Sequence, residues 1–314
     1  MTILITGAYG FIGSNLARWL KSKGMELIGL DVTRKELGDF KERYTWEEIN
    51  KIDFCNIDAV IHLAGKAHDL KGVSQDREYR EVNYGLTKQI LDTLNLKFKM
   101  TSGRVMPAFV LMSSVKACAD SFVGVMNEET PPHPTTAYGK SKLMAEEYVR
   151  RNYPAAYMLR SCMVHGPGNK GNFNLLFALS RTGLPWPLGA FENARSFVSV
   201  KNLCFAIERI VSARPSPGLY LIADDLPIST NRLLRLLWQA QEKRGIILRL
   251  PKGLVRAFAK AGDIIGLPLN SERLGKLTDS FVVSNQKIKT ALGVDQFPIT
   301  AEDGLVDTIQ SLNI

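Results

Sequence analysis

The sequence has few cysteines and no long apolar run. Its four cysteines lie at least 42 residues apart and form no C-x-x-C pair, a spacing that favours free thiols over disulfides or a zinc site. No apolar run is longer than the five residues from Ala108 to Met112, whereas a membrane-spanning helix needs roughly 18. Met1 leads directly into Thr2–Thr6, without the basic and apolar regions of a secretory signal. We therefore expect a cytoplasmic protein that does not span a membrane.

Signals for metals and nucleic acids are also missing. The four histidines show no H-E-x-x-H spacing, so no metal site is expected. No block of Lys and Arg carries interleaved aromatic residues, and we therefore expect no nucleic-acid partner. The composition, 45% hydrophobic and 23% charged, is typical of a globular enzyme with one large domain or two smaller ones.

The net charge of +9 is unevenly placed, with +2 in residues 1–153 and +7 in residues 154–314. A basic half indicates an anionic partner, such as a phosphorylated small molecule or an anionic membrane. Residues 226–262 hold eight Lys and Arg and one acid, Glu242. The apolar residues between these charges include Leu254, Val255, Phe258 and Ala259. Two interpretations stay open: an amphipathic surface that makes peripheral membrane contact, and a solvated basic face over ordinary core residues.

Short apolar segments alternate with helical patterns in the first half of the chain. The predicted strands are Thr2–Thr6, Glu26–Asp31, 58–63 and Ala108–Met112, and the predicted helices are 11–20 and 79–94. These strands are too apolar to have a solvent-exposed face, and they alternate with helices. The pattern indicates an α/β fold with a parallel sheet covered by helices on both sides. After Gly166-Pro167-Gly168 the pattern breaks into short pieces, with helices predicted near 229–243, 251–264 and 300–312.

A glycine-rich turn lies between the first strand and the first helix, in Gly7-Ala-Tyr-Gly10-Phe-Ile-Gly13. Gly7 permits the tight turn, Gly10 lets the backbone approach a pyrophosphate, and Gly13 lets the helix pack on the strand. The helix N-terminus then faces the phosphates. Asp31 ends the second strand 18 residues after Gly13, near the offset of a carboxylate that binds the adenosine ribose. The sequence thus predicts a doubly wound, dinucleotide-binding Rossmann domain over residues 1–165. Residues 166–314 would mainly form a smaller, mostly helical substrate-binding lobe. Whether part of this segment returns to the Rossmann domain stays open.

Asp31 also bears on the choice of cofactor. A carboxylate accepts hydrogen bonds from free ribose hydroxyls but repels a 2′-phosphate, so NAD(H) is favoured. Arg34 and Lys35 follow closely and could offset that repulsion, so NADP(H) stays open.

A second motif, Tyr138-Gly-Lys-Ser-Lys142, begins a predicted helix. Residues four apart share one helical face, so the phenol and the ammonium can reach one pocket. A Tyr hydroxyl has a pKa of about 10, and we expect the nearby Lys cation to favour its ionised form. Ser113 and Ser114 directly follow an apolar strand, which would place a hydroxyl at the carboxyl edge of the sheet.

These motifs occur in an order that resembles one protein family. The matching segments are 7–13, Asp31, 62–65, Val82-Asn83 with Thr87, 112–114, 129–131, 138–142 and 164–168. In this series the chain is similar to the extended short-chain dehydrogenases/reductases of the NAD-dependent epimerase/dehydratase family, which remodel nucleotide sugars. His165 stands where the family usually has Tyr, and Cys162 where many members have Pro.

The resemblance implies roles for individual residues. The catalytic residues would be Ser114, Tyr138 and Lys142. The cofactor would contact Gly7, Tyr9, Gly10, Phe11, Ile12, Gly13, Asp31, Val32, Arg34, Leu63, Ala64, Gly65, Lys66, Asn83, Met112, Ser113, Tyr138, Lys142 and Val164. The substrate would contact Lys116, His165, Asn172, Pro187, Leu188 and Arg195. Arg195 would grip the phosphates of a UDP-sugar, and Asn172 would bind the diphosphate or the sugar.

Within the family, the segments 113–116, 168–173 and 186–195 most resemble bacterial 4-ketoreductases. These reduce UDP-2-acetamido-2,6-dideoxy-4-ketohexoses with NAD(P)H in surface polysaccharide synthesis. A UDP-sugar 4-epimerase with tightly bound NAD has the same catalytic groups and is the alternative. A third hypothesis, a dinucleotide-sensing regulator without activity, is disfavoured because Ser114, Tyr138 and Lys142 are all present. The family usually forms homodimers.

Overall fold

The computed structural model describes the chain except residues 37, 68–75, 100–104, 170–172, 266–269 and 313–314. The strands are β1 (Thr2–Thr6), β2 (Glu26–Asp31), β3 (Glu42–Thr45), β4 (Ala59–His62), β5 (Ala108–Ser114), β6 (Val125–Met126), β7 (Tyr157–Ser161), β8 (Met163–His165), β9 (Phe197–Ser199), β10 (Gly218–Ile222) and β11 (Val282–Val283). The α-helices are α1 (Phe11–Ser22), α2 (Asp76–Tyr79), α3 (Leu86–Lys99), α4 (Ala137–Asn152), α5 (Phe173–Arg181), α6 (Val200–Ala213), α7 (Thr230–Ala240), α8 (Lys252–Ile265), α9 (Ser271–Thr278), α10 (Gln286–Leu292) and α11 (Ala301–Leu312). Short 3₁₀ turns are η1 (Trp46–Lys51), η2 (Phe54–Asn56) and η4 (Val115–Ala117), and η3 (Arg80–Gly85) is a π-helix.

Seven parallel strands form the central sheet, in the order β10-β7-β5-β4-β1-β2-β3. The chain builds outward from β1 in one direction through β2 and β3 and then in the other through β4, so the order reverses between β1 and β4. In open α/β sheets a ligand crevice lies at this reversal, beyond the carboxyl ends of the strands. The predicted doubly wound parallel sheet is confirmed.

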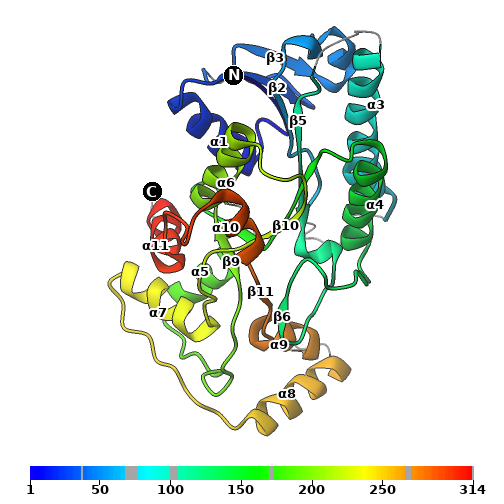
Figure 1. Ribbon diagram of the computed structural model, residues 1–314. Helices are drawn as coiled ribbons and strands as arrows, with labels where there is room; N and C mark the ends of the chain where they lie inside the picture. The colour runs from blue at the N-terminus through cyan, green and yellow to red at the C-terminus, as the bar shows by residue number, and fades with distance from the viewer. Residues whose placement is uncertain (37, 68–75, 100–104, 170–172, 266–269, 313–314) are drawn as a thin grey trace.

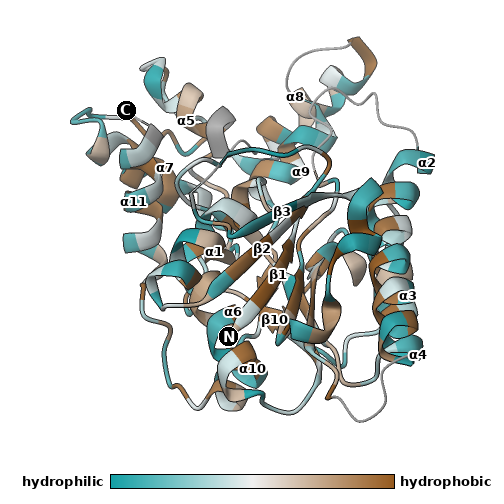
Figure 2. Ribbon diagram, turned by 90° about the horizontal axis from the view of Figure 1, so that it is seen from above, coloured by the Kyte–Doolittle hydropathy of each residue, from teal (hydrophilic) through white to brown (hydrophobic). Residues whose placement is uncertain are grey.

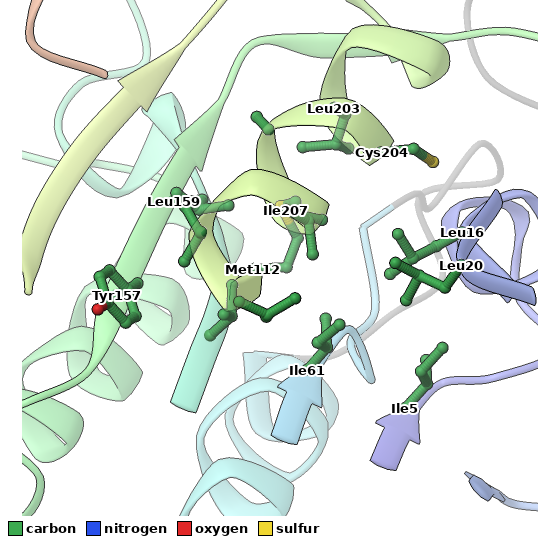
Figure 3. Packing of buried hydrophobic residues seen from close by; sticks show 14 of the residues in the cluster. Ile5, Leu16, Leu20, Ile61, Met112, Tyr157, Leu159, Leu203, Cys204 and Ile207 are labelled. Atoms are coloured by element: carbon green, nitrogen blue, oxygen red, sulfur yellow. The ribbon is translucent and has the colours of Figure 1, made fainter. Parts of the chain in front are cut away.

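Successive strand residues point to opposite faces, and each face packs against helices. On one face Ile5, Ile61 and Leu159 pack with Leu16 of α1 and Ile207 of α6, as Figure 3 shows. The opposite face of the strands packs against α3 and α4. The residues in that second cluster include Leu4, Val60, Leu111, Ile90, Leu94 and Val149. Because both faces are buried, the strands read as the continuous apolar runs seen in the sequence.

The chain leaves the sheet domain after β8 but returns to it. Residues 200–222 supply α6, which covers the sheet, and β10, which pairs with β7 at the edge. α10 also packs on α6 and β10, with Ile288 and Leu292 in the core of the sheet. Most of the remaining chain forms a mainly helical lobe whose core includes Trp186, Leu237 and Leu305. Figure 1 shows α7, α8 and α9 at the end of the molecule away from β1–β3, and Figure 2 shows the apolar strands enclosed by helices. Among the helices that the structure describes, none is long and apolar enough to cross a membrane.

Candidate functional site

The glycine-rich turn forms a close-fitting cradle at the carboxyl end of β1. Gly7 has a φ of +65°, the left-handed region, and its N–H donates to the carbonyl of Leu30 at 2.9 Å. A Cβ on Gly7 would lie 2.8 Å from the amide nitrogen of Ala64, and a Cβ on Gly13 would lie 2.3 Å from the carbonyl oxygen of Gly7. Only glycine fits at these two positions, which leaves the N-terminus of α1 open to a phosphate group.

The carboxylate of Asp31 is held in place where β2 ends. One oxygen accepts the backbone N–H of Tyr9 at 2.9 Å, and the other accepts the N–H of Val32 at 2.8 Å. These bonds fix the carboxylate beside the glycine-rich turn, and the exposed side chain of Val32 leaves the approach open. The arrangement fits the predicted binding of an adenosine ribose by Asp31.

Arg34, the residue that could have accommodated a 2′-phosphate, is paired with an acid. Its Nε donates to Glu48 at 3.2 Å, and its Nη2 also contacts that carboxylate. The hydrogen bonds from Arg34 and from the N–H of Thr45 lower the pKa of Glu48 to about 2, and the pairing raises the pKa of Arg34. Because Glu48 already compensates the charge of Arg34, the site favours NAD(H) over NADP(H).

Asn83 lies in the π-helix η3 and secures the loop that follows β4. Its Oδ1 accepts the N–H of Lys66 at 2.8 Å, while its Nδ2 donates to the carbonyl of Lys66 at 3.1 Å and to Ser141 of α4 at 2.9 Å. Asn83 is buried, and a Cβ on Gly65 would lie 2.9 Å from its Oδ1. π-Helical turns are often found at functional sites, and this one joins the loop to α4.

A buried chain of hydrogen bonds lies beneath the same loop, and we did not predict it. The hydroxyl of Thr6 accepts the N–H of Ala64 at 3.2 Å and bonds Nδ1 of His62 at 2.7 Å. Nε2 of His62 bonds Thr87 at 2.9 Å, and Thr87 donates to the carbonyl of Asn83 at 2.7 Å. Burial lowers the pKa of His62 to about 3, so this histidine is a neutral connector. The sequence signals were a polar residue at the end of each of two apolar strands and the presence of His62, Asn83 and Thr87 in the motif series, which does not specify their bonds.

The three predicted catalytic residues meet at the carboxyl end of β5 and the start of α4. Thr136 caps α4 by accepting the N–H of Gly139 at 3.2 Å. Tyr138 and Lys142 follow one turn apart, and Tyr138 makes a side-chain hydrogen bond with Ser114. The ammonium of Lys142 is buried and donates to the carbonyl of Met112 at 3.0 Å. The spacing of the motif therefore brings these groups together as expected.

The electrostatics of this group differ from our expectation that Lys142 would favour ionisation of Tyr138. Burial raises the pKa of the Tyr138 phenol, and the hydrogen bond with Ser114 only opposes that rise. Burial likewise lowers the pKa of Lys142 to about 8, against the opposing effect of Glu146. Desolvation is the largest cause of both shifts, and it drives each group toward its neutral form.

Ser113 has a structural side chain, unlike its neighbour. Its hydroxyl donates at 2.5 Å to Glu146, which forms a buried ion pair with Arg160 at 2.7 Å. Adjacent strand residues point to opposite faces, so Ser114 faces the site when Ser113 faces α4. Met112 likewise meets the site through its carbonyl, since its side chain packs in the sheet core. Ser113 and Met112 thus have only their backbones available for cofactor contact.

The remaining predicted cofactor residues lie around the same edge of the sheet. Tyr9 packs edge-to-face on Phe40, with ring centroids 5.8 Å apart. Lys66 contacts Glu78. The other predicted contacts, Gly10, Phe11, Ile12, Leu63 and Val164, lie in the turn, at the start of α1, after β4 and in β8.

Two of the predicted substrate residues come together on the lobe side. The Lys116 ammonium lies 5.2 Å from the ring centroid of Phe281, and Arg195 pairs with Phe281 through its backbone. Burial lowers the pKa of Lys116, and the charges of Arg195 and Lys276 lower it further against the opposing effect of Asp120. Burial also lowers the pKa of Arg195. This cluster of cations, Lys116, Arg195 and Lys276, would gain from an anionic ligand.

Other predicted substrate residues have structural surroundings. His165 is fully buried: its Nδ1 bonds Thr308 of α11 at 2.9 Å, and its Nε2 lies 3.4 Å from Asp224. The Leu188 side chain belongs to the lobe core, and Pro187 is half-buried beside it. The contacts of His165 and Leu188 are thus with the protein interior. Asn172 lies outside the described residues. Among the residues that the structure covers, no group of three or more His, Cys, Asp or Glu side chains could hold a metal ion.

Comparison with known proteins identifies the family. Residues 3–223 match the family described as the NAD dependent epimerase/dehydratase family. The chain is 29% identical to the UDP-glucose 4-epimerase of Vibrio cholerae, over 99% of this chain and 95% of the relative. It is 26% identical to the N-acetyl-alpha-D-glucosaminyl-diphospho-ditrans,octacis-undecaprenol 4-epimerase of Escherichia coli O157:H7, over 98% and 94% of the two chains.

A solved structure shares the fold. UDP-glucuronic acid 4-epimerase from Bacillus cereus, in complex with UDP-glucuronic acid and NAD, superposes with a TM-score of 0.73 at 20% identity, covering 100% of this chain and 99% of its own. The match to the family extends over most of the chain, and the predicted resemblance to this family and the preference for NAD are confirmed. The chain therefore belongs to the NAD dependent epimerase/dehydratase family.

Proposed function

We propose that this protein is a UDP-hexose 4-epimerase that uses NAD and returns it unchanged at the end of each turnover. The observation that carries the proposal is the group of buried Ser114 and Lys142 and half-buried Tyr138 at the sheet edge, beside a cradle suited to a dinucleotide. Two relatives that match nearly the whole chain are named as 4-epimerases. They support this alternative over the 4-ketoreductase interpretation.

Each catalytic residue has a distinct task in this proposal. Tyr138 takes the proton from the C4 hydroxyl of the sugar and later returns it, while Ser114 hydrogen-bonds the same oxygen. Lys142 holds the ribose next to the nicotinamide. When bound, NAD would accept the hydride from C4 of the sugar and could return it to the same carbon.

The remaining residues hold the two ligands in place. Asp31 binds the adenosine ribose, and the N-terminus of α1 binds the pyrophosphate. Lys116 and Arg195 hold the diphosphate of the nucleotide sugar, because a fork of guanidinium donors matches phosphate oxygens. Between hydride removal and return the keto sugar must present its other face.

The experiment incubates the purified protein with UDP-glucose or UDP-N-acetylglucosamine and no added reductant, and identifies the products by NMR. The proposal predicts conversion to the C4 epimer. Unchanged UDP-hexoses, together with stoichiometric NAD(P)H consumption on a UDP-4-keto-6-deoxy-N-acetylhexosamine, would instead establish the 4-ketoreductase. The Escherichia coli relative is named for a sugar linked through a diphosphate to undecaprenol, so a lipid-linked N-acetylglucosamine belongs in the same assay. Tyr138→Phe is the matched control.

A further inference from the structure

Helix α8 carries apolar side chains that the protein does not bury. Val255 and Ala259 pack in the lobe core, but Leu254 is 48% exposed and Phe258 is 61% exposed. At the carboxyl end of the helix, Ile265 is 67% exposed. The sequence had grouped Leu254 and Phe258 with Val255 and Ala259, and the structure separates the two pairs.

The exposed apolar residues share one side of the helix. We define the α8 face as Leu254, Ala257, Phe258, Ala261, Ile264 and Ile265, all of which are exposed. At 100° per residue these positions fall within a sector about 120° wide, adjacent to the sector that faces the core. Leu250, just before the helix, is also exposed and continues the line at a spacing of four.

Basic residues occupy a second sector of the same helix. Lys252, Arg256 and Lys260 follow one another at spacings of four, are exposed, and lie on the side of the helix roughly opposite the α8 face. The ammonium of Lys252 lies 5.9 Å from the ring centroid of Phe191. The acid of the helix, Asp263, accepts hydrogen bonds from the backbone and the hydroxyl of Ser271. Long basic side chains can extend along a helix to reach phosphate groups beside an apolar face. Exposed apolar and basic sectors on one helix are typical of helices that lie in the interface of an anionic bilayer.

The position of α8 makes such contact feasible. Figure 1 shows α8 at the outer end of the lobe, beyond α9 and at the opposite end of the molecule from β2 and β3. From these observations we propose that the α8 face docks reversibly on an anionic phospholipid surface, with Leu254 and Phe258 entering the bilayer interface and the three basic residues binding lipid phosphates. This proposal is independent of the reaction catalysed.

The test is co-sedimentation of the intact protein with vesicles of phosphatidylcholine, with or without phosphatidylglycerol. We expect binding to the anionic vesicles that weakens as salt is raised. Leu254→Glu combined with Phe258→Glu should weaken binding roughly tenfold or more, since two buried apolar side chains are lost. Arg256→Glu should weaken binding to the anionic vesicles roughly fivefold or more.

Val123→Glu is the matched control, because Val123 is 98% exposed and lies between β5 and α4, far along the chain from α8. This variant should bind as the wild type does. All variants should keep the wild-type unfolding temperature, since the substituted side chains are exposed. The proposal is overturned if the wild type does not sediment with anionic vesicles or if the double variant binds equally well. It is also overturned if the double variant converts a dimer into a monomer without changing lipid binding, since the face would then contact a second copy.

Discussion

At the scale of single residues, burial controls the chemistry of the catalytic group. Desolvation raises the pKa of Tyr138 and lowers the pKa of Lys142, so it disfavours charge on both. The phenol is therefore protonated near neutral pH in the free protein and must give up its proton before it can take one from the C4 hydroxyl, while the ammonium of Lys142 is close to losing one. A bound ligand that stabilises negative charge on the phenol would lower the pKa of Tyr138 and so oppose the effect of desolvation.

Replacing Tyr138 with phenylalanine should remove the transferable proton and little else. We expect kcat to fall about 10²–10⁴-fold, the usual contribution of a general acid or base. NAD affinity, measured by calorimetry, should stay near that of the wild type. Full activity in this variant would show that another group moves the proton.

Lys142 predicts a particular dependence of stability on pH. Its folded-state pKa of about 8 lies below the ordinary value of 10.5, so below pH 8 the folded state bears the cost of a buried charge. As pH rises from about 8 to about 10.5, the unfolded chain binds more protons than the folded one, and the stability of the wild type should rise relative to Lys142→Met. Denaturant titrations of both proteins in that window measure the change. A pH-independent difference would contradict the lowered pKa.

The pair of Arg34 and Glu48 predicts how cofactor preference can be changed. Glu48→Gln should leave Arg34 available to a 2′-phosphate and raise NADP(H) affinity relative to NAD(H). Asp31→Ala should lower NAD(H) affinity more than NADP(H) affinity, because the carboxylate attracts ribose hydroxyls and repels a phosphate. Glu36→Ala, at an exposed position nearby, is the control. An unchanged ratio of the two dissociation constants in both test variants would refute these roles.

At the scale of elements, the π-helix η3 connects the loop after β4, which holds Lys66, to α4 through the side chain of Asn83. Asn83→Ala should weaken NAD binding roughly tenfold, because both backbone groups of Lys66 and the hydroxyl of Ser141 lose a partner at a cost of about 1–3 kcal/mol. Thr93→Ala on the exposed side of α3 is the matched control. If Asn83→Ala binds NAD as tightly as the control does, the loop is held by other contacts.

The sequence predicted regular elements better than irregular ones. The segment 26–31 is a strand as predicted, and 251–264 became α8, because both carry strong periodic signals. The segment 79–94 was expected to be one helix, but the structure has the end of α2, then η3 and α3. The apolar spacing there is helical throughout, and a π-turn changes it too little to detect.

In the site, too, features fixed by local helix and turn geometry were predicted, and features fixed by tertiary packing were not. The spacing of Tyr138 and Lys142 and the glycines at 7, 10 and 13 predicted their neighbourhood, because helix and turn geometry fix it locally. The bonds from His62 to Thr6 and Thr87 join segments 25 to 56 residues apart. The pairing of Arg34 with Glu48 likewise depends on where η1 folds back. Such contacts depend on tertiary packing, which a single sequence does not specify.

At the scale of the whole molecule, a rigid sheet carries the cofactor residues and a helical lobe carries Arg195. The return of α6 and β10 to the sheet ties the two together. Figure 1 shows both crossing between the regions. The basic surplus of residues 154–314 includes Arg195, Lys276 and the basic residues of α8. In the two proposals, this positive charge of the lobe faces the diphosphate of the nucleotide sugar and, on the outer side, lipid phosphates.

The central claim is that the site removes a hydride from C4 of a UDP-hexose and returns it to the same carbon. The most direct measurement is turnover of UDP-glucose deuterated at C4, without added NAD(P)H, followed by NMR and mass analysis of the product. We predict UDP-galactose that retains the deuterium at C4, formed about 10²–10⁴-fold more slowly by Tyr138→Phe. Loss of the deuterium from the product would contradict the account. So would a protein that leaves both UDP-glucose and UDP-N-acetylglucosamine unchanged.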